Sequence, residues 1–448
     1  MGWVKMKLGD VIKNREGRYK PNAPTIAGLK RIDKINFSGQ IFLSDKGSNT
    51  DMILIKKGDL VISGINVEKG ALAVYEGEED ILATIHYSSY IFDTTKIDID
   101  FLKVFLRSPD FIQLLKEQVP GGIKTEIKPK HILPLEVYFP ETTKEQKAIA
   151  LHFFEKEAKF NQLNEHISYQ LTQLENLNQA ILQEAVQGKL VKQDPKDEPA
   201  SELLKRIKAE KESLIKAKKL KSGKSTDQSV SYTDDYEIPK SWTWCKTDDI
   251  FFVTKLAGFE YTEHIKLQEF GEIPVVRAQN VRPLEIDKTN LLYIDREVSQ
   301  LLDRCSLTKK CLLVTFIGAG IGDVATFNER NRWHLAPNVA KMEPFEGCEE
   351  MIDVTYVNYF LMSKIGQREL FKHIKATAQP SLSMGTIRDI DVPLPPLTEQ
   401  KRIVAEIEKQ FALTKQLKEH IIANQQATEQ LLKALLHQAF EVREVETV

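Results

Sequence analysis

The fold is decided by two stretches, Glu145–Ala185 (EQKAIALHFFEKEAKFNQLNEHISYQLTQLENLNQAILQEA) and Glu399–Ala439 (EQKRIVAEIEKQFALTKQLKEHIIANQQATEQLLKALLHQA). A shift of 254 residues aligns them without a gap, and 15 of the 42 positions from 145 to 186 are then identical. The segments before them, Ile132–Pro140 and Ile387–Pro395, also match. A repeat of this length determines the architecture. The chain is therefore a tandem duplication.

Each copy is predicted to end in one long helix. No Pro or Gly interrupts either stretch, and Ala, Leu, Gln, Glu and Lys dominate both. Each helix would have about 42 residues and a length of roughly 60 Å. Thr143 with Gln146 three residues later predicts a capping box, whereas Thr398, followed by Lys401, predicts a cap without the box partner.

A seven-residue apolar repeat in both helices predicts a coiled coil. The heptad is assigned with position a at Phe160, Ile167, Leu174, Ile181, Thr414, Ile421, Thr428 and Leu435, and position d at Leu163, Gln170, Leu177, Glu184, Leu417, Asn424, Leu431 and Gln438. Two of these residues, Gln170 and Asn424, are polar at matching d positions. Either the seam tolerates them, or they pair with each other and fix the register.

The segments before the helices alternate short β-rich runs with turns and short helices, which predicts two related α+β domains. Strands are expected at Met52–Ile55, Asp59–Ser63 and Leu72–Tyr75, and again at Leu312–Phe316 and Asp323–Phe327. The predicted boundaries are 1–142 for the first domain, 143–187 for the first long helix, 188–235 for a short basic helix and flexible linker, 236–397 for the second domain, 398–440 for the second long helix, and 441–448 for a tail.

The basic helix belongs to the segment between the two copies. Nine Lys or Arg and two Glu lie between Leu203 and Lys224. Such a run is expected to form a solvated helical face, and the alternative is a strip that faces phosphates.

Composition excludes several classes of protein. The 448 residues are 42% hydrophobic and carry a formal net charge of -2, so the chain can build cores and is not a general polyanion-coating protein. The longest nearly uncharged apolar run, Cys311–Gly322, is too short for a membrane helix of roughly 20 residues, and no secretory signal is expected. We therefore expect a cytoplasmic protein. Its four cysteines lack zinc-knuckle spacing, so they are expected to be free thiols, and no metal site is expected.

These features together resemble one family, the DNA-specificity subunits of type I restriction-modification enzymes. The resemblance rests on Pro395–Lys401 (PPLTEQK) and its divergent twin Pro140–Lys147, together with Ala185–Leu190, Ala200–Ile207 and Ile238–Trp242. It implies two target-recognition domains, each reading half of a bipartite site on double-stranded DNA, separated by a long antiparallel two-helix coiled coil. It also implies a non-catalytic subunit that scaffolds two modification (methyltransferase) subunits and the restriction subunits. S-adenosylmethionine, ATP and Mg are then expected on those partners and none on this chain.

Candidate DNA-binding residues come from side-chain type and from position at strand ends. Arg, Lys, Asn and Gln match purine edges, and small or glycine-rich loops let the backbone approach phosphates. The candidates are Arg277, Gln279, Asn280 and Arg282 after one β-like run, Gln379 and Ser381 before the last strand, and Lys124, Lys128, Lys130, Asn66 and Lys69 in the first domain.

Two other classes of function stay open. A structural coiled-coil adaptor would use the same long helices and would not bind duplex DNA with sequence selectivity. A stand-alone nuclease is suggested by Asp110, Glu126 and Lys128, but this spacing is loose and the repeat places serines opposite the last two. The glycine-rich run Gly318–Gly322 is expected to form a turn, because Asp323 stands where a dinucleotide fingerprint needs its third glycine.

Overall fold

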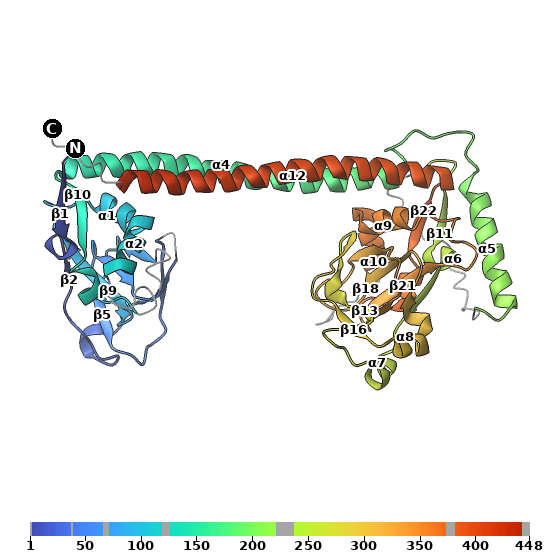
Figure 1. The fold of residues 1–448 in the computed structure, drawn as a ribbon, viewed down its shortest axis with the longest axis horizontal. Helices are drawn as coiled ribbons and strands as arrows, with labels where there is room; N and C mark the ends of the chain where they lie inside the picture. Colours follow the sequence, from blue (N-terminus) through green and yellow to red (C-terminus); the bar gives the residue numbers. More distant parts are fainter. Residues whose placement is uncertain are drawn as a thin grey trace. The chain divides into compact units, whose positions relative to one another are not determined.

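A computed structural model of the chain describes residues 2–36, 39–65, 71–118, 126–220, 237–372 and 381–440 (Figure 1). The chain forms two compact units. Unit 1 is Met1–Tyr169 with His420–Val448, and unit 2 is Gln170–Glu419. The two long helices, α4 (Thr143–Val186) and α12 (Leu397–Phe440), therefore each contribute residues to both units. Among the described residues, no helix is both long and apolar enough to cross a bilayer.

Unit 1 has two four-stranded sheets, in the orders β2-β9-β6-β7 and β4-β3-β8-β5, and a two-stranded ribbon, β1-β10. The strands are β1 (Trp3–Lys7), β2 (Ile12–Asn14), β3 (Arg31–Ile35), β4 (Ile41–Ser44), β5 (Met52–Ile55), β6 (Leu60–Ser63), β7 (Leu72–Val74), β8 (Ile81–Thr84), β9 (Tyr87–Phe92) and β10 (Glu136–Pro140). The helices are η1 (Leu8–Asp10), η2 (Pro24–Ile26), α1 (Ile99–Leu106), α2 (Pro109–Gln118) and α3 (Pro129–Ile132).

Unit 2 repeats this arrangement with sheets β12-β21-β18-β19 and β16-β13-β20-β17 and the ribbon β11-β22. Its strands are β11 (Thr243–Lys246), β12 (Phe251–Lys255), β13 (Ile273–Val276), β14 (Val281–Arg282), β15 (Glu285–Ile286), β16 (Leu292–Ile294), β17 (Ser306–Leu307), β18 (Cys311–Thr315), β19 (Val324–Phe327), β20 (Trp333–Leu335), β21 (Val339–Pro344) and β22 (Asp391–Leu394). Its helices are α5 (Ala200–Lys216), α6 (Thr247–Ile250), α7 (Gly258–His264), η5 (Ala278–Asn280), α8 (Arg296–Leu301), η6 (Asp303–Cys305), α9 (Val354–Met362), α10 (Lys364–Phe371) and α11 (Met384–Arg388).

The two units share their strand order, including the parallel pair at the centre of one sheet, β3–β8 in unit 1 and β13–β20 in unit 2. The predicted mixture of helices and sheets is confirmed. One difference stands out. Unit 2 carries an additional hairpin, β14–β15, between β13 and β16, whereas only residues 36–40 join the corresponding strands β3 and β4.

The repeated Glu-Gln-Lys motif ties each long helix to its unit through a buried glutamine. Gln146 Oε1 accepts from the backbone N–H of Asp98 at 2.7 Å, and its Nε2 donates to the carbonyl of Pro140 at 3.0 Å. Gln400 makes the corresponding bonds, to the N–H of Asp353 at 2.9 Å and to the carbonyl of Pro395 at 2.9 Å. Each aspartate caps the helix that covers its sheet, α1 or α9. The motif is therefore a structural joint.

The predicted caps differ from the observed ones. At the start of α4 the cap is made by Thr142 and not by Thr143, because the Thr142 hydroxyl accepts from the Glu145 N–H at 3.2 Å and donates to the Glu145 carboxylate at 3.0 Å. The predicted partner Gln146 is already engaged in the joint. Thr398 lies inside α12, which begins at Leu397, and its hydroxyl donates to Asp197.

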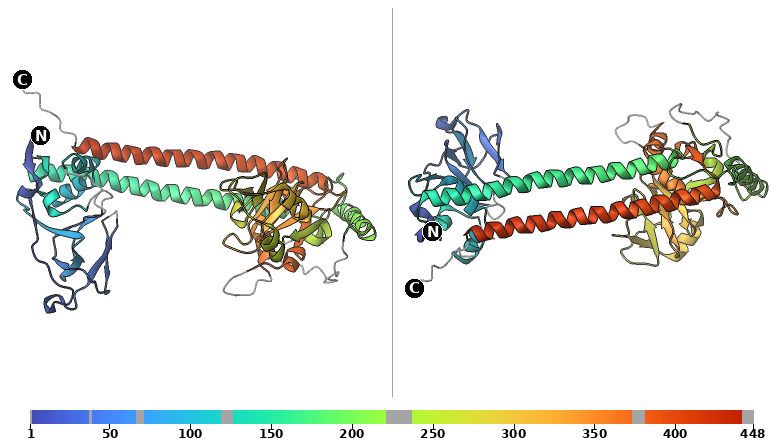
Figure 2. Two further views of the ribbon diagram at one scale, coloured as in Figure 1. Left: turned by 60° about the horizontal axis from the view of Figure 1, so that its bottom comes forward. Right: turned by 90° about the horizontal axis from the view of Figure 1, so that it is seen from above.

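Within unit 2, the C-terminal part of α4 packs along the N-terminal part of α12 (Figures 1 and 2). Asn178 lies opposite Thr414, and Gln193, beyond the end of α4, bonds to Glu399 near the start of α12. The two segments are therefore antiparallel. Thr414 is 8% exposed as a residue, and its hydroxyl donates to Asn178 Oδ1 at 2.8 Å, so the seam contains a hydrogen-bonded polar pair.

The predicted heptad assignment is correct at the a positions but wrong at the d positions, where the seam residue lies one place later. The predicted a positions are buried or half-buried, but the leucines at the predicted d positions are 42 to 59% exposed, and Gln170 and Asn424 are exposed as well. The buried stripe instead alternates the predicted a positions with residues four places later, such as Leu171, Asn178 and Ala185. Gln170 and Asn424 are therefore not seam residues, and the polar seam pair is Asn178 with Thr414.

The far end of each helix completes a core. Phe440, the last residue of α12, is 6% exposed in unit 1, with its ring centroid 5.6 Å from Phe101 and 5.4 Å from Phe105. Val186, its counterpart in the repeat, is fully buried in the core of unit 2 at the end of α4. Each unit thus contains the start of one long helix and the end of the other.

Candidate nucleic-acid interface

The segment after β13 holds four of the predicted DNA-binding residues, and the structure divides them by role. Asn280 is 1% exposed, and its Nδ2 donates to the carbonyls of Asp287 at 3.0 Å and Thr289 at 3.3 Å. Arg277 is half-buried, and its guanidinium donates to the carbonyl of Asn290. Both side chains are engaged in closing the loop around the additional hairpin. Asn280, in this conformation, is a scaffold residue and cannot reach a base.

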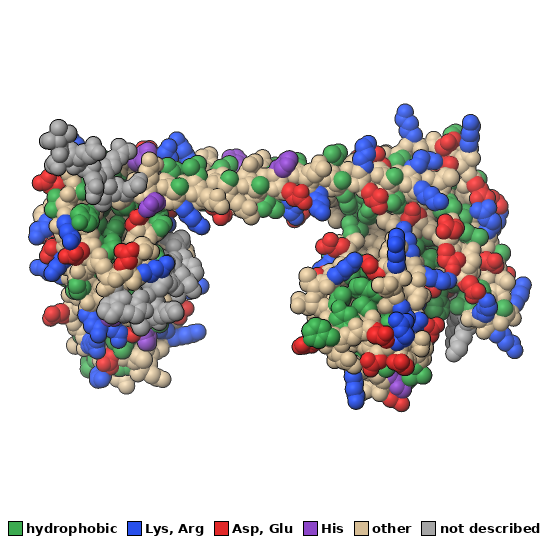
Figure 3. Space-filling model, viewed as in Figure 1, with side chains coloured by type: hydrophobic (Ala, Val, Ile, Leu, Met, Phe, Trp, Pro, Cys, Tyr) green, Lys and Arg blue, Asp and Glu red, His purple; other side chains and the backbone are tan. Residues whose placement is uncertain are grey.

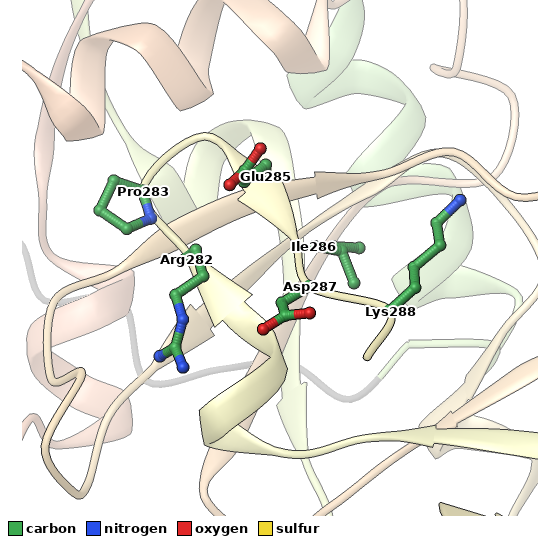
Figure 4. A pocket seen from close by; sticks show the side chains of 6 residues that line it. All are labelled: Arg282, Pro283, Glu285, Ile286, Asp287 and Lys288. Carbon is green, nitrogen blue, oxygen red and sulfur yellow. The ribbon is translucent and has the colours of Figure 1, made fainter. Parts of the chain in front are cut away.

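The other two, Gln279 and Arg282, are exposed. Arg282 lines a hollow of about 560 Å³ along the hairpin β14–β15, shared with Pro283, Glu285, Ile286, Asp287 and Lys288 (Figure 4). The Thr289 hydroxyl, followed by the Thr289 N–H, lowers the pKa of Asp287. Lys288 is ion-paired with Glu329 at 2.8 Å. Among the described residues that line this hollow, Arg282 is therefore the cation without an ion-pair partner.

A second loop, between β18 and β19, lies beside the hairpin. Leu284 in the hairpin donates its N–H to the carbonyl of Val324 at 2.8 Å. The glycine-rich run forms a turn, as predicted, with a 3.1 Å hydrogen bond from Ile321 N–H to the carbonyl of Gly318, whose φ is +112°. Ser381 is exposed and pairs with Ile317 in an isolated bridge at the start of this loop. Gln379 lies outside the described residues.

In unit 1, Lys128 and Lys130 are exposed near the start of α3. Lys128 is 3.1 Å from the carboxylate of Glu126, so one of the two predicted phosphate contacts already has an acidic partner. Lys124, Asn66 and Lys69 lie outside the described residues. The possible nuclease set is divided, since Asp110 bonds to His437 at 2.9 Å while Glu126 bonds to His86 at 2.8 Å.

The basic helix α5 has most of its cations paired within the chain. Ion pairs join Lys205 to Glu202, Arg206 to Glu198, Lys208 to Asp249, and Lys211 to Asp248, and beyond the helix Lys219 pairs with Glu346. The pairs with Asp248 and Asp249 attach α5 to α6. A phosphate-facing strip therefore has few free charges here, and the interpretation as a docked, solvated helix is favoured. On the face drawn in Figure 3, basic and acidic side chains are intermixed in both units.

Residues 239–424 match the family model of the type I restriction modification DNA specificity domain. The predicted family resemblance is confirmed. The matched specificity domain contains every described candidate of unit 2, namely Arg277, Gln279, Asn280, Arg282 and Ser381.

Two curated relatives are specificity subunits from Escherichia coli. The chain is 26% identical over 272 residues to the type I restriction enzyme EcoEI specificity subunit, and 27% identical over 267 residues to the EcoAI specificity subunit. These alignments cover 59% and 58% of this chain but 43% of each relative, so the aligned part spans less than half of the relatives' length.

One solved structure has a similar fold over nearly the whole chain. It is a chain from the structure described as the basis of complex assembly and conformational transition of the type I R-M system. The match has a TM-score of 0.60 and 14% identity, and covers 98% of this chain and 97% of that one. At this identity the likeness concerns the fold alone.

Sequence reasoning named Arg277 and Asn280 but missed that their side chains close the loop around the hairpin. The loop-closing role of Asn280 could not be inferred from the residue type, because amide side chains suit both base edges and backbone groups. The ion pairs of α5 join residues far apart in sequence. For the joints at the starts of α4 and α12 the sequence did carry a signal, since Gln146 and Gln400 align in the two copies.

Proposed function

We propose that this chain is the DNA-specificity subunit of a type I restriction-modification enzyme and reads a bipartite target, one half with each unit. The observation that carries the proposal is the repeated strand order. A duplicated fold places equivalent loops at the same sheet edge twice, which suits two half-sites on one duplex. The paired segments of α4 and α12 would form the spacer between the two target-recognition domains.

In unit 2, the proposed reading element is the hairpin β14–β15 with Gln279 and Arg282. A two-stranded ribbon fits the major groove, and an arginine can bond a guanine with two donors. Ser381 borders the neighbouring loop, and Arg277 and Asn280 would hold the hairpin in place. In unit 1, Lys128 and Lys130 would face phosphates. Such contacts position the protein but carry no sequence information.

The chain is proposed to act without catalysis of its own. Methylation and cleavage would belong to two modification subunits and to restriction subunits, which would also bind S-adenosylmethionine, ATP and Mg. Exposed leucines on the long helices support a scaffolding role. They include Leu163 and Leu431 in unit 1, and Leu177 and Leu417 in unit 2. Their regular spacing beside the seam suits packing against helices of partner subunits.

The test is to map methylated positions in the genome of cells that express this chain with its partner subunits. A split motif is expected, and exchange of residues 240–397 with those of a relative should change one half only. Arg282→Ala should weaken discrimination at one base pair of that half by about 1–3 kcal/mol. Lys418→Ala, which removes an exposed cation from α12 outside the Glu-Gln-Lys motif, is the control. An unsplit motif, or no methylation that depends on this chain, would contradict the proposal.

A further inference from the structure

Each unit has a corner where three separate segments meet at the end of a central strand. In unit 1, Gly64 after β6 donates its N–H to the carbonyl of His86 at 2.8 Å and accepts from the N–H of Ile127 at 2.8 Å. In unit 2, Phe316 after β18 donates to the carbonyl of Asn338 at 3.1 Å and accepts from the N–H of Leu382 at 2.9 Å. The same two backbone bonds thus build both corners.

These bonds make specific residues equivalent. His86 in the turn before β9 corresponds to Asn338 in the turn before β21. Glu126 precedes Ile127 as Ser381 precedes Leu382, so these two residues also correspond. His86, Asn338 and Ser381 are exposed, and the side chain of Glu126 is 28% exposed. The backbone is shared, while the polar side chains that it presents differ completely.

In unit 1, the backbone at Gly64 and the backbone at Ile127 lie so close together that no side chain fits at position 64. A Cβ on Gly64 would lie 2.5 Å from the carbonyl oxygen of Ile127. Because this contact is with backbone, it could not be relieved by rotating a side chain. Glycine at this position therefore allows the backbone of Ile127 to lie against the end of β6, which places Glu126 next to this strand end.

The Glu126 carboxylate is also oriented by its neighbours. Oε1 lies 2.8 Å from His86 Nδ1, and Oε2 lies 3.1 Å from Lys128 Nζ. The hydrogen bond with His86, and then the one with Lys128, lowers the pKa of Glu126, so the group is ionised at neutral pH. Each carboxylate oxygen can accept more than one hydrogen bond, which leaves acceptor capacity for a further donor. Lys128 offsets the repulsion that a lone carboxylate would meet beside phosphates.

We propose that the corner residues are specificity-determining, with Glu126 and His86 reading bases in the half-site of unit 1, and Asn338 and Ser381 in that of unit 2. This inference rests on the proposed function. Glu126 would accept from the exocyclic amine of cytosine, and Asn338 would bond the N6 and N7 edge of adenine. Replacing these side chains changes the half-site without changing the framework.

The experiment uses the full chain with its partner subunits, and compares the methylated motif in cells expressing wild type, Glu126→Gln and Asn338→Ala. Glu126→Gln keeps the size of the side chain and removes its charge. It should reduce the preference at one base pair in the half read by unit 1 by about tenfold, and leave the other half unchanged. Asn338→Ala should do the same in the opposite half. Glu155→Gln, an exposed site on α4, is the matched control and should retain the wild-type motif.

The results can refute the role of the corner residues without refuting the proposed function. A split motif whose base frequencies are unchanged in both corner variants would overturn this inference and leave the proposed function standing. Absence of a split motif in the wild type would overturn both. Because Asn338 is exposed, its truncation is expected to leave the fold intact. Thermal unfolding of each variant checks that a changed motif does not follow from loss of structure.

Discussion

The joint between the long helix and its unit makes a quantitative prediction for Gln400. This residue is fully buried, and truncation by Gln400→Ala would leave the N–H of Asp353 and the carbonyl of Pro395 without partners. Each buried group left unsatisfied costs about 1–3 kcal/mol. The free energy of unfolding of unit 2 should therefore fall by about 4 kcal/mol. A water molecule that entered the space would reduce this loss.

The consequence should be local as well as global. The N–H of Asp353 belongs to the residue that caps α9, so amide hydrogen exchange should accelerate first in α9 and β22. Peptide-resolved exchange is preferable to a single melting curve, since a chain with two units need not unfold in one step. Gln146→Ala should produce the same pattern in α1 and β10 of unit 1.

Gln416→Ala provides the control. Gln416 lies on the same helix and is also matched by a glutamine in the first copy, Gln162, but both are exposed. Its truncation should change stability by less than about 0.5 kcal/mol. If Gln400→Ala and Gln416→Ala had equal effects on unfolding and exchange, the interpretation of the motif as a structural joint would be refuted.

Three further predictions concern stability. Phe440→Ala should destabilise unit 1 by about 3–4 kcal/mol and accelerate exchange in α1, whereas Leu431→Ala, 59% exposed, should be nearly neutral. Burial lowers the pKa of His334 to about 4. Since an unfolded His titrates near 6.5, unit 2 should lose about 3 kcal/mol between pH 6.5 and 4, and His334→Gln should flatten this slope in urea titrations. Thr414→Val should cost about 1–2 kcal/mol by orphaning Asn178, and a double-mutant cycle with Asn178→Val should show the coupling; additive losses would exclude it.

The duplication was the part of the fold that the sequence predicted best. Gapless identity along the helices required equivalent domains before them, and the strand orders of the two units agree. The heptad phase was not predictable in the same way. Asn178 and Thr414 occupy the seam, whereas Leu177 and Leu417 lie outside it, so a count of apolar residues selects the wrong stripe. Polar seam residues satisfied by each other cannot be distinguished from surface residues in a single sequence.

The candidate site shows the same limit for a different reason. Side-chain type correctly identifies which residues can bond a base, but burial decides whether they can reach one. Asn280 has the right chemistry and is enclosed, whereas Arg282, two residues later, is exposed on the hairpin. The sequence suggested Glu126 only as a possible nuclease residue. Its partner His86 lies 40 residues away, so the bond between them could not be predicted without the fold.

The comparison of the two units explains how one chain could read two unequal half-sites. The shared strand order and the buried glutamines Gln146 and Gln400 fix the framework, so sequence differences that touch neither can accumulate at the strand ends. There the units differ in charge at the corner, with Glu126 in one and Ser381 in the other, and in length, because only unit 2 has the β14–β15 hairpin within the described residues. Because the strand order is shared and the strand ends differ, the hairpin residues 277–291 can be transplanted into unit 1 between β3 and β4. We expect the transplant to extend the half-site read by unit 1 and to leave the half read by unit 2 unchanged. Mapping of the methylated motif would detect this change. If the half-site read by unit 1 were unaltered in a folded chimera, the prediction that the hairpin carries base reading with it would be refuted.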